Sequence, residues 1–237
     1  MIRRAMEYIN ELRKPELMEV GTEVYSDKEL HRVSYNPKAK FIEMTTLTSL
    51  VEYLKANIDS MKAKMLVHVV SPTKVRLYSQ LDQDRVREYM VEVNAQLPEF
   101  KYDSYYDSEA FLIALQSKFI DNEDRALLLK FAGTVENGSV AQYDDDGVTQ
   151  KATVKTGIVS KGEAIVPNPV KLRPFRTFIE VEQPESAFVF RMKGNSGSVA
   201  CAIFEADGGA WRNVAMKNVK EYLEYELADL KQFTVIS

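Results

Sequence analysis

The chain has 237 residues, of which 45% are hydrophobic and 28% are charged, and its formal net charge is −4. This length and composition are typical of a globular chain with a sizeable core. The negative charge argues against a broad, sequence-independent DNA-binding surface, which needs clustered Lys and Arg, but it is compatible with a local basic patch. The chain has a single cysteine, Cys201, so it cannot form an intrachain disulfide, which fits a reducing compartment. The apolar neighbours of Cys201 favour a small buried side chain over a functional thiol.

The N-terminal 40 residues have the weakest pattern. Residues 1–14 are spaced for a short amphipathic helix that ends before Pro15, and residues 15–40 are expected to be a loop with one short strand near 32–35. The N-terminus lacks the apolar core of a secretory signal, and no run approaches the roughly 18 apolar residues of a membrane span. We therefore expect a cytoplasmic protein with no membrane contact.

Residues 41–94 predict one helix and three strands. The helix is indicated by apolar residues at three- and four-residue spacing from Met44 to Ile58, with Thr45 or Thr46 as its N-cap. Alternating apolar residues predict strands at 65–70 and 74–81, joined as a hairpin, and a third strand at 87–94. In the third strand the alternation places Tyr89, Val91 and Val93 on one face.

Residues 107–159 predict two helices followed by strands. Asp107 can cap a helix that runs through Phe119, and acidic residues from Asp121 begin a second helix that ends at Gly133. Strand alternation then covers residues 134–159, with Asp144-Asp145-Asp146-Gly147 at a hairpin tip. That tip resembles a calcium-binding loop, but it lacks the closing glutamate, which favours a solvated turn.

The stretch from Ile165 to Trp211 organises the C-terminal third. Prolines at 167, 169 and 174 require an extended backbone, and three apolar runs at 175–181, 187–192 and 198–204 predict a three-strand antiparallel meander. Gly208 and Gly209 permit a sharp reversal into a final helix capped by Asn213. The tail at 233–237 either adds an edge strand or frays.

Strands and helices thus form separate clusters, which favours an α+β fold with antiparallel sheets, hairpins and four to five helices, ending in a meander followed by a helix. We expect residues 1–40 to form an N-terminal arm that either moves or packs on another subunit. Residues 41–237 are expected to form a single α+β domain, with a weak boundary between two lobes near 134–140.

No catalytic signature is present: the chain contains no phosphate-binding glycine motif, no nucleophile elbow and no cluster of His and Cys. We therefore expect no catalytic residue, no metal ligand set and no cofactor. One alternative remains open, in which Glu205 and Asp207 bind a divalent ion together with Asp144 to Asp146; the other interpretation of these two acids is a turn that leads into a helix.

The best candidate binding surface consists of two arginines, two acids and the only tryptophan of the chain: Arg173, Arg176, Glu205, Asp207 and Trp211. Basic side chains interleaved with aromatic ones are typical of single-stranded nucleic-acid binding. Pairing with the nearby acids is the simpler account of these charges. If one arginine is spared from pairing, we expect it to be Arg173 or Arg176, because prolines hold the preceding backbone rigid. Trp211 either plugs the corner between sheet and helix or offers a platform for a partner.

Several segments carry a resemblance to a known family: LRPFRTFIEVEQPESAFVFRMKG, CAIFEADGGAW, DDGVTQKATVKTGI, FLIALQSKF and VHVVSPTKVRLYS. Together they resemble the YfdQ-like prophage proteins, a family without an assigned function, over roughly residues 41–228. The resemblance implies an intracellular accessory protein encoded by a phage or prophage, and it transfers no catalytic role.

Our leading hypothesis is a non-enzymatic accessory protein that acts in the bacterial cytoplasm by macromolecular binding, as a homo-oligomer. Its partner would be a host or defence protein, or single-stranded nucleic acid. The alternatives are a metal-dependent hydrolase or nuclease that uses the acidic cluster, and a protein that anneals or protects DNA.

Overall fold

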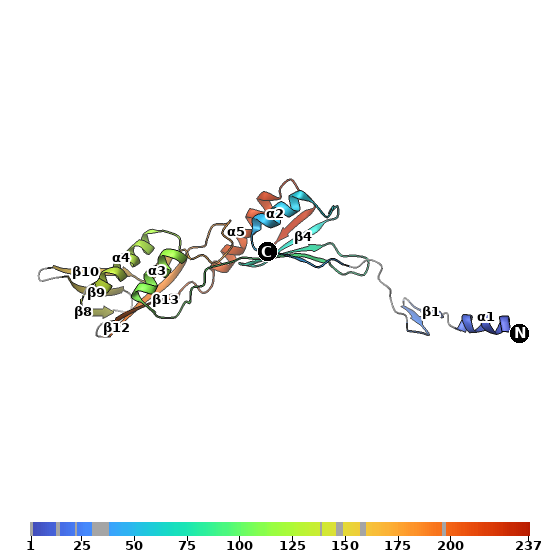
Figure 1. Ribbon diagram of the computed structural model, residues 1–237, viewed down its shortest axis with the longest axis horizontal. Helices are drawn as coiled ribbons and strands as arrows, with labels where there is room; N and C mark the ends of the chain where they lie inside the picture. The colour runs from blue at the N-terminus through green and yellow to red at the C-terminus, as the bar shows by residue number, and fades with distance from the viewer. Residues whose placement is uncertain are drawn as a thin grey trace. The chain divides into compact units, whose positions relative to one another are not determined.

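The structure is a computed structural model, and it comprises two units, Met1–Ala39 and Lys40–Ser237 (Figure 1). The described residues are 2–12, 15–21, 23–29, 38–137, 139–145, 149–156, 160–195 and 198–237. They form five α-helices and four separate β-sheets. Along the chain, helices and strands occur mostly in separate groups and do not alternate strictly. This arrangement confirms the predicted α+β class.

The N-terminal unit contains one helix and one hairpin. The helix α1 (Ile2–Leu12) confirms the predicted amphipathic helix. Strands β1 (Leu17–Val20) and β2 (Glu23–Ser26) pair antiparallel across a two-residue loop, where Gly21 adopts a φ of 68°. This hairpin occupies residues that we expected to be a loop, and the strand predicted near 32–35 lies outside the described residues.

The larger unit has two hydrophobic cores, and we name the parts around them lobe A and lobe B. Lobe A contains a five-stranded sheet made of β3 (Ile42–Met44), β4 (Met65–Ser71), β5 (Lys74–Ser79), β6 (Tyr89–Asn94) and β14 (Phe233–Ile236). The strand order is β14-β4-β5-β6-β3; the inner three strands are antiparallel, and the two edge strands pair in parallel with their neighbours. The C-terminal tail is therefore an edge strand.

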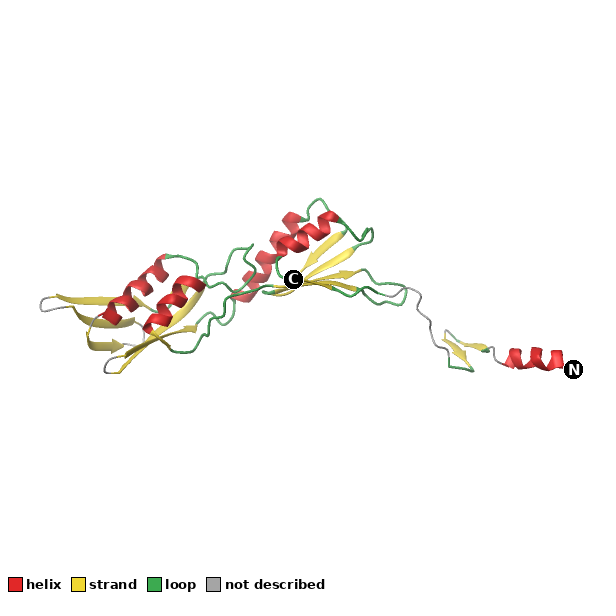
Figure 2. Cartoon of the chain, viewed as in Figure 1, coloured by secondary structure: helices red, strands yellow, loops and turns green. Residues whose placement is uncertain are grey.

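Two helices, α2 (Leu47–Ala56) and α5 (Trp211–Glu226), lie together on one face of this sheet (Figure 2). The start of α2 follows the predicted capping, because the side chain of Thr46 accepts a hydrogen bond from the backbone N–H of Ser49. Its buried side chains repeat at helical spacing and pack on the sheet: Leu47, Leu50, Val51 and Leu54. In α5 the buried stripe is Ala215, Val219 and Leu223.

Lobe B is built from residues between β6 and α5, apart from the segment around Phe178 and Val181, which packs in the core of lobe A. Its helices are α3 (Ser108–Lys118) and α4 (Glu123–Asn137). Its strands are β7 (Tyr106–Asp107), β8 (Ser139–Asp145), β9 (Thr149–Thr156), β10 (Ser160–Pro167), β11 (Val170–Leu172), β12 (Ser186–Asn195) and β13 (Ser198–Glu205). They form a four-stranded sheet of order β11-β12-β13-β7 and a three-stranded sheet of order β10-β9-β8. As predicted, the side chain of Asp107 caps α3 by accepting from the N–H of Ala110.

The two lobes do not separate near residues 134–140. Phe131, which precedes this segment, and Val166, which follows it, both belong to the core of lobe B. The chain passes between the lobes before Tyr106 and after Glu205, and the segment between β11 and β12 also returns to lobe A, where Phe178 and Val181 belong to the core.

The predicted first strand of the meander, Phe175–Val181, is wrong, and Val170–Leu172 (β11) takes its place beside β12. The side chain of Gln183 explains the irregular backbone. Its Oε1 accepts from the N–H groups of Arg176 and Thr177, and its Nε2 donates to the carbonyls of Thr177, Phe178 and Val181. One buried amide thus bonds to five backbone groups of this segment, with three carbonyls sharing its two N–H donors, in place of the pairing that a neighbouring strand would provide.

Two helix boundaries also differ from the predictions. Helix α4 continues past Gly133 to Asn137, so the glycine does not end it. Helix α5 begins at Trp211 after Ala210, without a side-chain cap, so Asn213 lies inside its first turn. The glycine reversal before α5 is confirmed, because Gly208 and Gly209 have φ angles of 62° and 81°.

Candidate functional site

Four of the five predicted site residues converge where β13 ends and α5 begins. We call this group the Arg176 cluster: Arg176, Glu205, Asp207 and Trp211, together with Ser186, Phe188 and Tyr102. Arg176 comes from the loop held by Gln183, whereas the acids come from the strand end and the turn that follows it. The twin-glycine turn brings Trp211 back beside this loop.

Arg176 is the centre of the cluster and is only 6% exposed. Its guanidinium donates to Glu205 Oε1 at 2.5 Å and to the hydroxyl of Ser186. The guanidinium carbon lies 4.1 Å from the ring centroid of Trp211, 5.4 Å from that of Phe188 and 5.8 Å from that of Tyr102. Cation–π packing of this kind stabilises a desolvated cation, so the aromatic cage is filled by a residue of the chain itself.

The two acids of the cluster are engaged as well. Ser186 donates to Asp207 Oδ2 at 2.7 Å, and the N–H of Gly209 donates to Oδ1 at 3.0 Å. Burial alone would raise the pKa of Asp207, but these hydrogen bonds and the charge of Arg176 outweigh it, so the pKa is lowered. Burial lowers the pKa of Arg176 and raises that of Tyr102.

Arg173 lies outside the cluster and bonds to Glu182 and to the carbonyl of Gln183. Both arginines are therefore paired with acids, as in the simpler of the two accounts from the sequence, and neither is spared for a ligand. Among the described residues no group of three or more His, Cys, Asp or Glu side chains could hold a metal ion. Asp146 and Gly147 of the predicted hairpin tip lie outside the described residues, as do the side chains of Asp144 and Asp145. The Arg176 cluster is best described as a set of contacts within the chain that stabilises the fold.

A second polar group lies on the face of lobe A's sheet that is turned away from α2 and α5, and we call this surface the open face. Val67, Val75, Leu77, Val91 and Val93 point into the core. The alternate residues of the same strands therefore point to the open face, among them His68, Lys74, Arg76, Tyr78, Glu92 and Asn94.

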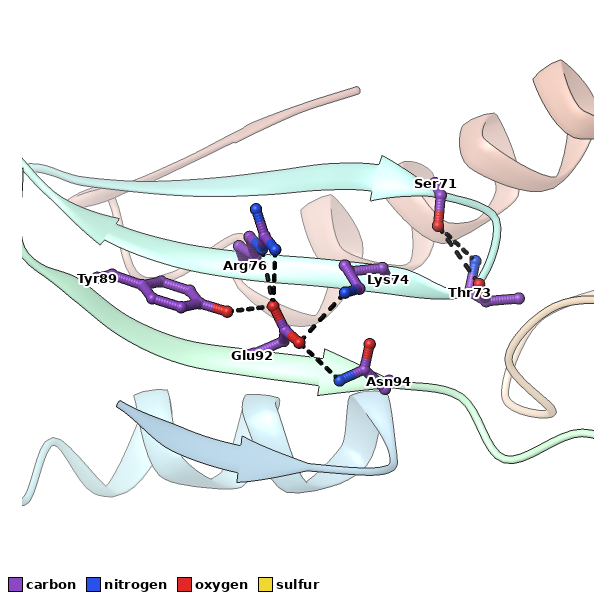
Figure 3. Close-up of polar contacts among 7 residues, drawn as sticks. All are labelled: Ser71, Thr73, Lys74, Arg76, Tyr89, Glu92 and Asn94. Carbon is purple, nitrogen blue, oxygen red and sulfur yellow. Dashed lines mark hydrogen bonds and ion pairs between the residues drawn. The ribbon is translucent and has the colours of Figure 1, made fainter. Parts of the chain in front are cut away.

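Glu92 is the hub of the open face, and we call the group around it the Glu92 cluster (Figure 3). Its carboxylate accepts from Arg76 Nε and Asn94 Nδ2, each at 2.9 Å, from Lys74 Nζ at 3.2 Å, and from the hydroxyl of Tyr89. The strand register explains the meeting, because Glu92 lies directly opposite Arg76. The side chain of Glu92 is 15% exposed, so these donors surround it almost completely.

The hydrogen bonds of this cluster shift the pKa values of Glu92 and Tyr89. Hydrogen bonds from Asn94 and Tyr89, followed by those from Arg76 and Lys74, lower the pKa of Glu92 to about 2. Burial and the bond to Glu92 raise the pKa of Tyr89 to about 12. At neutral pH Glu92 is therefore negatively charged, and the hydroxyl of Tyr89 keeps its proton and can donate it in a hydrogen bond to Glu92.

An aromatic row continues from this cluster across the sheet. The ring of Tyr89 stacks on Phe41 at 4.6 Å between centroids and on Tyr78 at 5.5 Å, and the guanidinium carbon of Arg76 lies 5.3 Å from the Tyr89 ring centroid. Phe41 remains 41% exposed. The open face thus presents aromatic and basic groups whose positions are fixed by contacts within the sheet.

The sequence prediction missed this site and placed Tyr89 with Val91 and Val93. An irregularity in the pairing of β5 with β6 puts Tyr89 opposite Tyr78 and moves it to the open face. The sequence did contain a pattern that could have indicated this site. Polar residues alternate with apolar ones in both β5 and β6, with basic residues in β5 and Glu92 in β6. Alternation identifies a face, but it does not supply the register that joins Arg76 to Glu92.

No protein family, curated protein or solved structure matches this chain. The resemblance to the YfdQ-like prophage proteins therefore stays a prediction. Within the described ranges, no helix combines the length and the apolar character that crossing a membrane requires.

Proposed function

We propose that this protein acts by binding another protein through the open face of lobe A, as a homo-oligomer and without catalysing a reaction. The observation that supports this proposal is the Glu92 cluster, which orders Arg76, Lys74 and Tyr89 on a sheet face opposite both helices of the lobe. Ordering such side chains on association costs about 0.5–1.5 kcal/mol each, and here that cost is met within the folded chain.

The chemistry of the open face also suits a protein partner. Tyrosine and arginine are enriched among the residues that dominate protein interfaces, and Tyr78, Tyr89 and Arg76 lie next to one another. Lys74 and Arg76 share the charge of Glu92, which leaves little unneutralised positive charge for a phosphate backbone. Single-stranded nucleic acid is the second candidate, because the exposed ring of Phe41 could stack on a base beside Arg76.

The enzymatic alternative, metal-dependent hydrolysis by Glu205, Asp207 and residues 144–146, has less support. Glu205 is paired with Arg176, and Asp207 accepts from Ser186 and Gly209, so a metal ion would first have to displace these partners. The resemblance to YfdQ-like prophage proteins supplies the setting of the proposal, which is the cytoplasm of a bacterium that carries a phage or prophage. The partner would then be a host or defence protein.

The test is affinity capture from such cells with two matched tyrosine variants. Tyr89→Ala removes the ring at the centre of the open face, whereas Tyr225→Ala removes a ring that is 80% exposed on α5. Tyrosines at the centre of an interface typically contribute 2 kcal/mol or more, so we expect Tyr89→Ala to reduce capture about thirtyfold and Tyr225→Ala to leave it unchanged. Thermal unfolding of both variants controls for loss of fold.

Three outcomes distinguish the candidates. A specific protein that is captured by wild type and Tyr225→Ala, resists nuclease and is lost with Tyr89→Ala supports the proposal. Capture that nuclease abolishes and that weakens steeply with salt favours the nucleic-acid candidate. Equal capture by both variants removes the open face as the binding surface.

A further inference from the structure

We infer that the N-terminal unit is a self-association element, in which α1 and the β1–β2 hairpin of one copy pack against the same elements of a second copy. This inference rests on the oligomeric part of the proposed function and names the surface responsible. It starts from nine large apolar side chains among the described residues of the unit that are at least half exposed: Ile2, Met6, Tyr8, Ile9, Leu17, Met18, Val20, Val24 and Tyr25.

The helix α1 has an i,i+4 ion pair, between Arg3 and Glu7, but its length and its terminal charges do not favour a stable isolated helix. It has eleven residues, no acidic residue in its first turn and no basic residue in its last turn. Helices shorter than about 12–15 residues are marginal in water, and charges that fail to complement the helix dipole weaken them further. Packing of its apolar stripe against another element would supply the missing stability.

The hairpin has the same deficiency. Met18 and Tyr25 form a cross-strand pair on one face, and Leu17 and Val24 lie on the other, with all four exposed by 57–67%. An isolated two-stranded hairpin is at best marginally stable in water unless a further strand or an apolar surface covers it. Because both faces carry apolar side chains, this hairpin needs contacts on two sides.

The pattern of α1 points to a second copy as the occupant. Residues 2, 5, 9 and 12 are Ile, Ala, Ile and Leu, which is the a/d heptad spacing of a helix that pairs with its own kind. Area supports the same conclusion. Nine exposed apolar side chains at on the order of 100 Å² each give about 900 Å², close to the ~800 Å² that each partner contributes to a standard interface.

The test compares two glutamine variants of the full chain by sedimentation velocity from about 1 to 100 µM. Ile9→Gln places an amide in the apolar seam, whereas Arg4→Gln makes the same replacement at a position outside the heptad seam. Glutamine has at least the helix propensity of isoleucine, so Ile9→Gln does not weaken the helix itself. Hydrogen exchange of the α1 amides at both concentration limits provides a second readout.

We expect the wild type to dimerise, Ile9→Gln to weaken the dimer at least about tenfold, and Arg4→Gln to match the wild type. Protection of the α1 amides should rise with concentration in the wild type only. A monomeric wild type overturns this inference and the oligomer proposal together, and α1 protection that is independent of concentration would show that the unit packs on its own chain. A dimer unaffected by Ile9→Gln overturns this inference alone, and capture through the open face is measured separately.

Discussion

Replacing Arg176 with methionine tests whether the Arg176 cluster stabilises the folded protein. The substitution keeps most of the side-chain volume inside the aromatic cage but removes the charge that pairs with Glu205. Removing one partner of a buried ion pair costs about 3–5 kcal/mol, because the remaining charge stays desolvated. The side chain of Glu205 is 28% exposed and can rehydrate in part, so we expect the lower limit, about 3 kcal/mol.

The assay is urea unfolding followed by the fluorescence of Trp211, which is the only tryptophan and lies against Arg176. With an m-value of about 2–3 kcal/mol/M, the expected destabilisation lowers the midpoint by about 1–1.5 M. Arg212→Met is the matched control, since that exposed guanidinium lies 5.0 Å from the same ring and its loss should cost less than about 0.5 kcal/mol.

A double-mutant cycle with Glu205→Gln isolates the pairing energy. Because each single variant leaves its partner unpaired, the double variant should be more stable than the sum of the two losses predicts, by about 1–3 kcal/mol. An Arg176→Met midpoint equal to that of Arg212→Met would refute the structural interpretation. The cluster would then have to be reconsidered as a binding site.

Three further predictions follow from other buried or bonded groups. Gln183→Ala leaves several backbone groups of its loop unpaired and should destabilise the fold by about 3 kcal/mol in the same urea assay, whereas the exposed Gln80→Ala should be neutral. Glu92 has its pKa lowered to about 2, so its stabilising effect is complete above about pH 4.5 and is lost as the pH falls toward 2. In acid unfolding across that window, the wild type should lose about 1 kcal/mol more free energy of unfolding than Glu92→Gln does. Parallel stability curves for the two proteins would refute this prediction. Cys201 is fully buried, so a thiol reagent should label it only under unfolding conditions, and rapid labelling of the native protein would contradict the core of lobe B.

Elements with a local signal could be predicted from the sequence. The stripe of α2 and the caps provided by Thr46 and Asp107 depend on residues within one or two turns, and the structure has them as expected. The hairpin of β4 and β5 also follows from alternation on both sides of a short turn.

The remaining features depend on partners that are distant in the sequence or on register. Phe175–Val181 alternates like a strand, but the amide of Gln183 satisfies its backbone, and alternation contains no information about that contact. Likewise, the convergence of Arg176 with Trp211 was expected from composition, whereas its role as the filler of an aromatic cage depends on tertiary packing. The contact of Tyr89 with Glu92 depends on a shift in pairing between β5 and β6 that no local pattern reveals.

The most direct test of the open face as a binding surface is hydroxyl-radical footprinting of the captured complex. We predict that oxidation of Phe41 and Tyr89 falls on binding, because a partner would cover the aromatic row, while oxidation of Tyr225 on α5 stays unchanged. Unchanged oxidation of Phe41 and Tyr89 together with protection of Tyr225 would contradict the account.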